Sequence, residues 1–477
     1  MNRDFTIFFT SDIHGRDRNS ARIFTIYKRE RAIAEAEGKT CLFFDAGDSS
    51  DRSLDYCGLT KCRAYTHILN AMGYDAQTVG NDIGLVYGLD SLKESLKRLN
   101  FPVLGANFRN GENPPLEGLK ENMIFYFGPI KIGVFGMSNP WGRAYEPLGL
   151  HFPDNVSCAQ EQTEKLKEKG AQVIIFLSHM GIQEDIEILF NNDDIDLVIG
   201  GHSHTRTPGG VINNSENLIH HCGQYGEYLG RVDITVDSET GKIISKKAFL
   251  YPVNDHVEEA PEIISAIEKA REEAAVIGRQ FVAAAQRDLD LDYWNECALG
   301  NLTADALCRY GNTELALVAA GNLQKPISKG EITRADLNRA CFSTANPCVS
   351  TMTGSAILES LEKGLDENLN RFYHHGLRGA PIGIPQISGM RVEADLSLKK
   401  GNRIKSVEIR GVPLDENKTY RIAHTDLESN KRLGFFPDTG HSLEAIDREI
   451  FLGDVIAGHL EESGLVNLTG ENRWNFL

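Results

Sequence analysis

The chain has 477 residues and a formal net charge of −17 at pH 7, from 50 Lys and Arg residues against 67 Asp and Glu residues. Hydrophobic residues make up 41% and charged residues 25%, which is ordinary for a globular protein and argues against a fibrous or disordered chain. The negative charge argues against binding to nucleic-acid polymers or anionic membranes, so an anionic substrate needs a local positive centre such as a metal ion.

The sequence favours a cytoplasmic protein with no membrane partner. Apolar runs such as 173–177 and 315–320 are far shorter than the roughly 18 residues of a membrane-spanning helix. The residues after Met1 lead directly into a predicted strand, without the apolar core of a signal peptide. Nine cysteines are scattered without a CxxC pair, a pattern typical of reduced thiols rather than of a disulfide framework.

The first half of the chain alternates short apolar runs with charged, helix-prone segments. Strands are predicted over 5–10, 40–44, 103–105, 173–177 and 197–199, and helices over 21–37, 92–99 and 158–170. Hairpin strands are predicted over 125–127 and 132–135, and again within 232–250. This alternation predicts a layered α/β fold.

A long amphipathic helix is predicted between the two halves, because isoleucines recur at helical spacing among glutamates over 257–278. Beyond it we expect a second α/β domain, with helices over 301–309 and 355–365, strands over 315–319, 386–394, 404–409 and 420–423, and a loop over 376–385. The predicted organisation is a first domain over 1–256, a linker helix over 257–278 and a second domain over 279–477.

Five short polar sequences follow apolar runs in the first domain. They are Asp12-Ile13-His14, Gly47-Asp48, Gly80-Asn81-Asp82, Ser178-His179 and Gly200-Gly201-His202-Ser203-His204. Each alone is commonly a turn, a cap or a packed histidine, but in an open α/β sheet the carboxyl ends of several strands form one ligand-binding edge. The expected metal ligands are Asp12, His14, Asp48, Asn81, His179, His202 and His204. This donor set suits two divalent ions, Mn²⁺, Zn²⁺, Fe²⁺ or Co²⁺, that share a carboxylate.

In this order, the motifs resemble those of the calcineurin-like metallophosphoesterases, and their spacing is similar to the bacterial 5′-nucleotidase/2′,3′-cyclic phosphodiesterase branch. Segments 298–307, 330–337, 350–361 and 386–391 resemble the C-terminal domain of that branch. The resemblance implies an N-terminal four-layer α/β/β/α domain and a C-terminal α/β substrate-specificity domain. It also implies a bridging Asp48, with one metal on Asp12, His14, Asp48 and His204 and the other on Asp48, Asn81, His179 and His202.

The activity implied by the resemblance is hydrolysis of a phosphoester, expected to be a monoester of the 5′-nucleotidase type, by a metal-bound hydroxide. The expected partner is a small phosphorylated substrate, of which a nucleotide is one form. Three alternatives stay open: a cyclic-nucleotide phosphodiesterase, a hydrolase of sulfur or phosphonate esters, and a catalytically impaired metal-binding or regulatory protein. Asn81 and Asp82 are the expected catalytic residues.

Asp82 departs from the family pattern, which has a histidine at this position to assist the leaving group or stabilise the transition state. A carboxyl group acts as an acid there only if its pKa is raised, whereas neighbouring cations lower it. We weigh a changed acid step equally against a role for Asp82 in holding a metal-bound water or capping a helix.

The second domain departs from the pattern as well. The arginine of the family segment is absent from 319–324, where Asn322 lies, and the adjacent Lys325 offers a point charge without the planar fork. Thr344 and Leu427 stand at the two base-stacking aromatic positions. Phe435 and Phe436, nearby in sequence, are either a replacement stacking face or, as is more common, core residues. Candidate substrate-binding residues are therefore Asn322, Lys325, Phe435 and Phe436.

One further pair of histidines lies at a predicted strand end. His220 and His221 precede Cys222-Gly223, so either one of them reaches the pocket or both lie in a solvated loop.

Overall fold

The computed structural model describes residues 2–82, 85–109, 115–140, 145, 148–212, 216–373, 377, 379–431, 434–467 and 472–477. The chain forms two compact units, unit 1 (Met1–Ala274) and unit 2 (Ala275–Leu477). The division falls within the segment 257–278 that the sequence predicts as a linker helix. Residues 376 and 378 of the predicted loop 376–385 lie outside the described residues.

Unit 1 is built on thirteen strands in the described residues: β1 (Asn2–Thr10), β2 (Thr40–Asp45), β3 (Ala76–Thr78), β4 (Val103–Leu104), β5 (Leu119–Lys120), β6 (Asn122–Phe127), β7 (Ile130–Ser138), β8 (Val173–His179), β9 (Leu197–Gly200), β10 (Val211–Ile212), β11 (Leu218–His221), β12 (Tyr228–Asp237) and β13 (Ile243–Pro252). Its helices are α1 (Asp17–Ala36), α2 (Asp55–Gly58), α3 (Thr66–Met72), α4 (Leu89–Arg98), α5 (Asn155–Glu168), α6 (Ile182–Phe190) and most of α7 (Pro261–Gly278), with 3₁₀ turns at Arg63–Tyr65 and Leu85–Tyr87.

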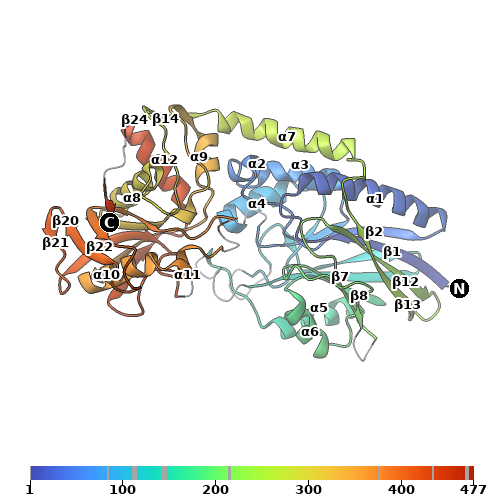
Figure 1. Ribbon diagram of the computed structural model, residues 1–477. Coiled ribbons are helices and arrows are strands. Elements are labelled where there is room, and N and C mark those ends of the chain that lie inside the picture. The colour runs from blue at the N-terminus through green and yellow to red at the C-terminus, as the bar shows by residue number, and fades with distance from the viewer. Residues whose placement is uncertain are drawn as a thin grey trace. The chain divides into compact units, whose positions relative to one another are not determined.

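Two sheets face each other in unit 1, in the orders β13-β12-β1-β2-β3-β4-β5 and β10-β11-β9-β8-β7-β6. Apolar side chains of β1, β2, β7, β8 and β9 form the core between them, as expected for strands that are buried on both faces. Helices α1, α3 and α4 cover the outer face of the first sheet, and α5 and α6 cover the outer face of the second (Figure 1). The four-layer α/β/β/α architecture of the N-terminal domain is confirmed.

Helix α7 packs its apolar face against unit 1. Its buried residues Ile263, Ala266, Ile267, Ala270 and Ala274 belong to the same core cluster as residues of α1 and α3. On its polar side, Glu273 accepts two hydrogen bonds from Arg98, at 2.7 and 2.6 Å, and lies 3.0 Å from His67 Nε2. Although the segment is rich in charged residues, one side of α7 is therefore buried and not exposed to solvent.

Unit 2 contains β14 (Phe281–Ala285), β15 (Leu315–Ala319), β16 (Gly330–Thr333), β17 (Pro347–Thr353), β18 (Pro385–Ser388), β19 (Met390–Ala394), β20 (Ile404–Ile409), β21 (Val412–Pro413), β22 (Thr419–Thr425), β23 (His441–Ile446), β24 (Leu465–Val466) and β25 (Trp474–Phe476). Its helices are α8 (Ala298–Tyr310), α9 (Arg334–Ala340), α10 (Gly354–Gly364), α11 (Glu367–Asn370) and α12 (Leu452–Ser463), with a 3₁₀ turn at Ala320–Asn322.

The strands of unit 2 form three sheets, ordered β16-β14-β24, β18-β15-β22-β17-β23 and β21-β20-β19-β25. One core cluster joins α8 and α12 to β15, and another joins α10 to β15, β18, β19 and β22, so the central sheet is covered on both faces. This confirms a second α/β domain. Across the described part of the chain, the helices lack the combination of length and apolar character that a membrane span requires.

Candidate metal centre

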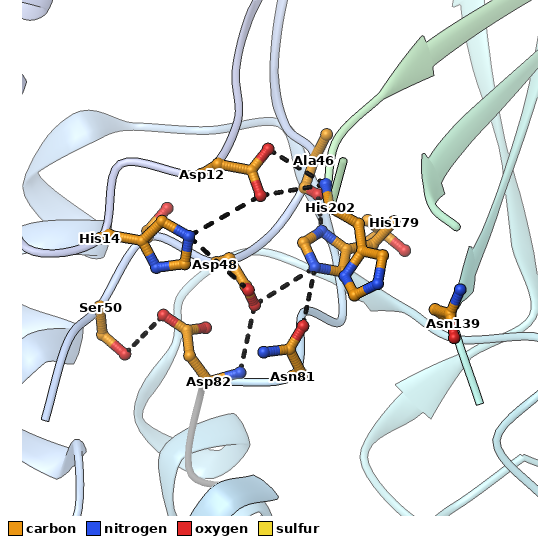
Figure 2. Close-up of polar contacts among 12 residues, drawn as sticks. Asp12, His14, Ala46, Asp48, Ser50, Asn81, Asp82, Asn139, His179 and His202 are labelled. Carbon is orange, nitrogen blue, oxygen red and sulfur yellow. Dashed lines mark hydrogen bonds and ion pairs between the residues drawn. The ribbon is translucent and has the colours of Figure 1, made fainter. Parts of the chain in front are cut away.

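The five polar motifs stand at the carboxyl ends of strands from both sheets of unit 1. Asp12 follows β1, Asp48 follows β2 and Asn81 follows β3, while His179 ends β8 and His202 follows β9. Strands β1, β2 and β3 are parallel neighbours in one sheet, and β8 and β9 are parallel neighbours in the other. The structure brings all seven predicted ligands together at this edge, most of them drawn in Figure 2.

A first donor group consists of Asp12, His14 and His204, whose potential ligand atoms lie within 4.8 Å of one another. The Nε2 atoms of His14 and His204 are 3.0 Å apart. Oδ1 of Asp12 lies 3.6 Å from Nε2 of His204 and 4.0 Å from Nε2 of His14. The two imidazoles and the carboxylate therefore point to a common position.

A second donor group consists of Asp48, His179 and His202, which also lie within 4.8 Å of one another. Nε2 of His179 lies 3.3 Å from Oδ1 of Asp48 and 3.2 Å from Oδ1 of Asn81. The other ring nitrogen of His179 donates to the carbonyl of Ala46 at 2.7 Å, which turns Nε2 toward the group. Sequence reasoning missed Ala46, because a backbone acceptor leaves no signal in a motif.

Asp48 connects the two groups through its two oxygens. Oδ1 faces His179, and Oδ2 lies 4.0 Å from Nε2 of His14 in the first group. This is the arrangement expected of a carboxylate that is shared between two cations. Gly80 makes the approach possible, since a Cβ there would stand 2.2 Å from Oδ1 of Asp48.

The backbone at the centre adopts an uncommon conformation. Left-handed φ angles occur at Asp12 (50°), His14 (45°), Asp48 (55°), His202 (70°) and His204 (56°), all of them non-glycine residues. Each such residue costs on the order of 1–3 kcal/mol and persists only where the surroundings fix it. Backbone hydrogen bonds supply that restraint: Asp12 N donates to Gly47 O at 2.9 Å, and His14 N donates to Asp48 O at 3.0 Å. Strain concentrated on the predicted ligands indicates a functional site.

The charges of the donor groups are buried and closely coupled. Burial raises the pKa of Asp12 to about 8. Burial also disfavours the charged forms of Asp48 and His179, but their mutual attraction outweighs it, so the pKa of Asp48 falls below its usual range and that of His179 rises to about 9. Burial lowers the pKa of His202 to about 4.

The donor set fits two divalent metal ions. Each group offers imidazole nitrogens together with carboxylate oxygen, the donors that Mn²⁺, Zn²⁺, Fe²⁺ and Co²⁺ accept, and a cation compensates carboxylates that burial otherwise penalises.

Asp82 is anchored to the same loop as Asp48. Its backbone N–H donates to Oδ1 of Asp48 at 3.2 Å, and the hydroxyl of Ser50 donates to its Oδ2 at 3.0 Å (Figure 2). Burial and then the charge of Asp48 raise the pKa of its carboxyl well above the usual range. Sequence reasoning missed Ser50, although it lies two residues after the Gly47-Asp48 motif. Residues 83 and 84 lie outside the described residues.

The candidate substrate-binding residues of unit 2 are not alike in exposure. Asn322 is fully buried, and its Oδ1 accepts a hydrogen bond from the hydroxyl of Ser343 at 2.7 Å, so its amide serves the local fold. Lys325 is exposed. Phe435 and Phe436 are 1% and 5% exposed within a core cluster of unit 2. Burial of both rings argues against the stacking role and corresponds to the alternative interpretation that they are core residues.

The structure corrects the expectation for His220 and His221. Both lie within β11, at 0% and 1% exposure, so neither occupies a solvated loop. Nε2 of His220 donates to the carbonyl of Phe249 at 3.0 Å, and Nε2 of His221 lies 2.8 Å from Oδ2 of Asp185. Parallel pairing of β11 with β9 buries a strand whose polar sequence suggested a loop.

Both units match known protein families. The family profile of the calcineurin-like phosphoesterases matches residues 5–206, and that of the 5′-nucleotidase C-terminal domain matches residues 276–438. The chain is 26% identical over 437 residues to the uncharacterized metallophosphoesterase YunD of Bacillus subtilis, covering 90% of this chain and 93% of that protein.

Two further similar proteins also match both units. A snake venom 5′-nucleotidase from Naja atra is 26% identical over 484 residues, with 88% of each protein covered. The crystal structure of a 5′-nucleotidase precursor from Thermus thermophilus matches with a TM-score of 0.58 over 99% of each chain, at 24% identity, which shows a common fold.

Proposed function

The chain belongs to the calcineurin-like metallophosphoesterases that carry a 5′-nucleotidase C-terminal domain, and we propose that it hydrolyses a phosphomonoester of the nucleotide type. The observation that carries the proposal is the position of Asp48, whose two oxygens face two separate groups of donors. Two metal ions about 3.5–4 Å apart can stabilise both the attacking and the leaving oxygen of a phosphoester, and a carboxylate shared between two donor groups suits two ions at such a separation.

In this proposal, the first cation is held by Asp12, His14 and His204, the second by Asn81, His179 and His202, and Asp48 is shared. Bound divalent ions supply Lewis-acid stabilisation of the phosphoryl oxygens and activation of a water molecule. Manganese is the metal that we propose to add first, because it accepts both the imidazole and the oxygen donors of these groups.

We propose that polar side chains next to Asp48 bind the phosphoryl group and assist the leaving group. Oδ1 of Asn81 faces His179, which directs its Nδ2 away from that ring as a donor for a phosphoryl oxygen. The carboxyl of Asp82, held by Ser50, is assigned to the leaving oxygen, the place of the usual histidine. In unit 2, the exposed Lys325 stays our candidate residue for binding an anionic group.

We also propose that the protein acts in the cytoplasm on a small phosphorylated molecule. All nine cysteines are free thiols in the structure, a state that a reducing compartment maintains. Fractionation of cells that express the tagged chain tests the location, and the proposal fails if the protein is recovered outside the cytoplasm.

The test of the proposed function is phosphate release by the purified protein with added Mn²⁺. The substrates are nucleoside monophosphates, 2′,3′-cyclic nucleotides, sugar phosphates, an aryl phosphate and its diester. Release from monoesters, with nucleoside monophosphates preferred, is the expected result. Turnover of the cyclic substrates alone would instead assign a phosphodiesterase, and metal binding without turnover of any substrate would assign a metal-binding protein.

A further inference from the structure

A buried polar network lies behind the second donor group. The hydroxyl of Ser178, in β8, donates to Oδ1 of Asp185 at 2.5 Å, and Nε2 of His221, in β11, lies 2.8 Å from Oδ2 of the same carboxylate. Ser178 and Asp185 are 0% exposed and His221 is 1% exposed. Because a buried carboxylate is costly without donors, Ser178 and His221 satisfy Asp185, which lies in the first turn of α6.

This network holds the chain on both sides of His179. The Ser178 hydroxyl that donates to Asp185 also accepts a hydrogen bond from the backbone N–H of Met180 at 3.1 Å. The residues immediately before and after His179 are therefore tied to one oxygen, whose position Asp185 sets. His179 itself is fully buried, so its ring orientation depends on the backbone that carries it.

The same network lies against the strand that leads to His202. A Cβ on Gly200 would stand 2.0 Å from Nε2 of His221 and 2.7 Å from Oδ2 of Asp185, so the pair touches the backbone of β9 directly. The next residue, Gly201, donates its N–H to the carbonyl of Ser178 at 2.9 Å. Asp185 and His221 thus connect Ser178, which precedes His179, with Gly200, which lies two residues before His202.

We propose that Asp185 and His221 are positioning residues that set the separation of His179 and His202 and thereby the affinity of the second metal site. The inference rests on the proposed function, since it assumes that these imidazoles hold a cation. Groups that hydrogen-bond a metal ligand are commonly worth about 10- to 100-fold in metal affinity, and we take this range for a network that acts on the residues next to the ligands. Among the described contacts, the side chains of the network bond to β8, to α6 and to one another and lie against β9, and none of these contacts involves Asp12, His14 or His204. We therefore expect its loss to affect one site selectively.

The experiment is a calorimetric titration of the full-length apoprotein with Mn²⁺. His221→Phe keeps a planar aromatic ring, slightly larger than the imidazole, and removes the donor, and we expect it to weaken one of two Mn²⁺ sites about 10- to 100-fold while the other is unchanged. His221→Gln, whose amide can still donate to Asp185, restores the affinity of that site. In a His204→Ala background, which removes one imidazole of the first donor group and should leave about one ion per chain, His221→Phe weakens the single remaining site.

The matched control is the same substitution at the adjacent buried histidine. Nε2 of His220 donates to the carbonyl of Phe249, its Nδ1 lies 3.2 Å from Oγ1 of Thr207, and neither nitrogen bonds to Asp185 among the described contacts, so we expect His220→Phe to leave both affinities unchanged. Asp185→Asn, which presents an amide in place of one oxygen, gives the selective loss independently if His221→Phe does not fold.

The inference is overturned if His221→Phe binds both ions as the wild type does, or if His220→Phe and His221→Phe weaken both sites equally. Wild-type protein that binds no Mn²⁺ would overturn the proposed function together with this inference. Wild-type protein that binds two ions, with His221→Phe unaffected, would overturn this inference alone.

Discussion

Nε2 of His14 and Nε2 of His204 lie 3.0 Å apart, although the two residues are separated by 190 positions in the sequence. Two imidazole nitrogens that each lie about 2.1 Å from one cation stand roughly 3 Å apart when they are neighbouring ligands. Both residues reach this contact with left-handed backbone angles, which position each ring at the end of a loop. The pair therefore has the geometry of two ligands of one ion.

Each donor group is expected to hold one ion of its own. His204→Ala and His202→Ala remove one imidazole each from the first and the second group, so each variant should retain about one ion per chain after dialysis. Metal content measured by elemental analysis checks this, alongside phosphate release. Loss of both ions in either variant would show that the groups do not bind independently.

Asp82→Asn should affect substrates according to their leaving groups. If the carboxyl of Asp82 serves the leaving oxygen, its loss should lower kcat about 10²- to 10⁴-fold for a nucleoside monophosphate. An activated aryl phosphate, whose leaving group needs no proton, should lose little. Steady-state kinetics on the two substrates measures the difference. Equal losses on both would assign Asp82 to holding the loop of Asp48 instead.

Phe435→Ala should destabilise unit 2 without weakening substrate binding. The ring is 1% exposed in a core cluster, and its removal should cost about 3–5 kcal/mol in the free energy of unfolding. The KM for a nucleoside monophosphate should stay at the wild-type value at a temperature where the variant is folded. A KM that rises severalfold in the folded variant would restore the stacking role.

Acid should destabilise unit 2 through His424. Its Nδ1 donates to the carbonyl of Thr425 at 2.7 Å and its Nε2 accepts from Ser350 at 2.8 Å, which fixes the neutral ring, and burial lowers its pKa from 6.5 to about 4. Between these values the unfolded chain binds a proton that the folded chain does not. The free energy of unfolding therefore falls as the pH falls through this window, by about 2 kcal/mol between pH 7 and pH 5.

The measurement for His424 is urea unfolding at both pH values, compared with His424→Asn, whose amide replaces the Nδ1 donor. The difference between the two proteins isolates this residue from other titrating groups. The wild type should lose more stability than the variant on acidification, and equal losses would contradict the assignment.

The strand ends and the donor set could be predicted because they rest on local pattern. Apolar runs such as the one that forms β8 predict strands from the sequence alone. Parallel strands then place the residues that follow each strand, such as Asp12 and Asp48, at one edge of the sheet. The architecture of unit 1 followed from the resemblance carried by these motifs. Helix boundaries differ by a few residues, as at α1, which begins at Asp17 rather than Ala21.

What the sequence could not show depends on long-range packing. The burial of His221 results from pairing with β9 and from contact with Asp185, 36 residues away. The approach of Ser50 to Asp82 and the left-handed angles of the ligands arise only when both sheets are assembled. The sequence could not decide whether Phe435 and Phe436 are core residues or a stacking face, because no periodic hydrophobic pattern surrounds them.

The most direct test of the dinuclear centre is the metal content of purified wild-type protein and Asp48→Asn, measured with phosphate release on the same samples. We expect about two ions per chain and turnover for the wild type, and loss of both turnover and metal for Asp48→Asn, since the Asp48 side chain serves both groups. An Asp48→Asn protein that retains two ions and wild-type turnover would show that Asp48 is not a shared metal ligand.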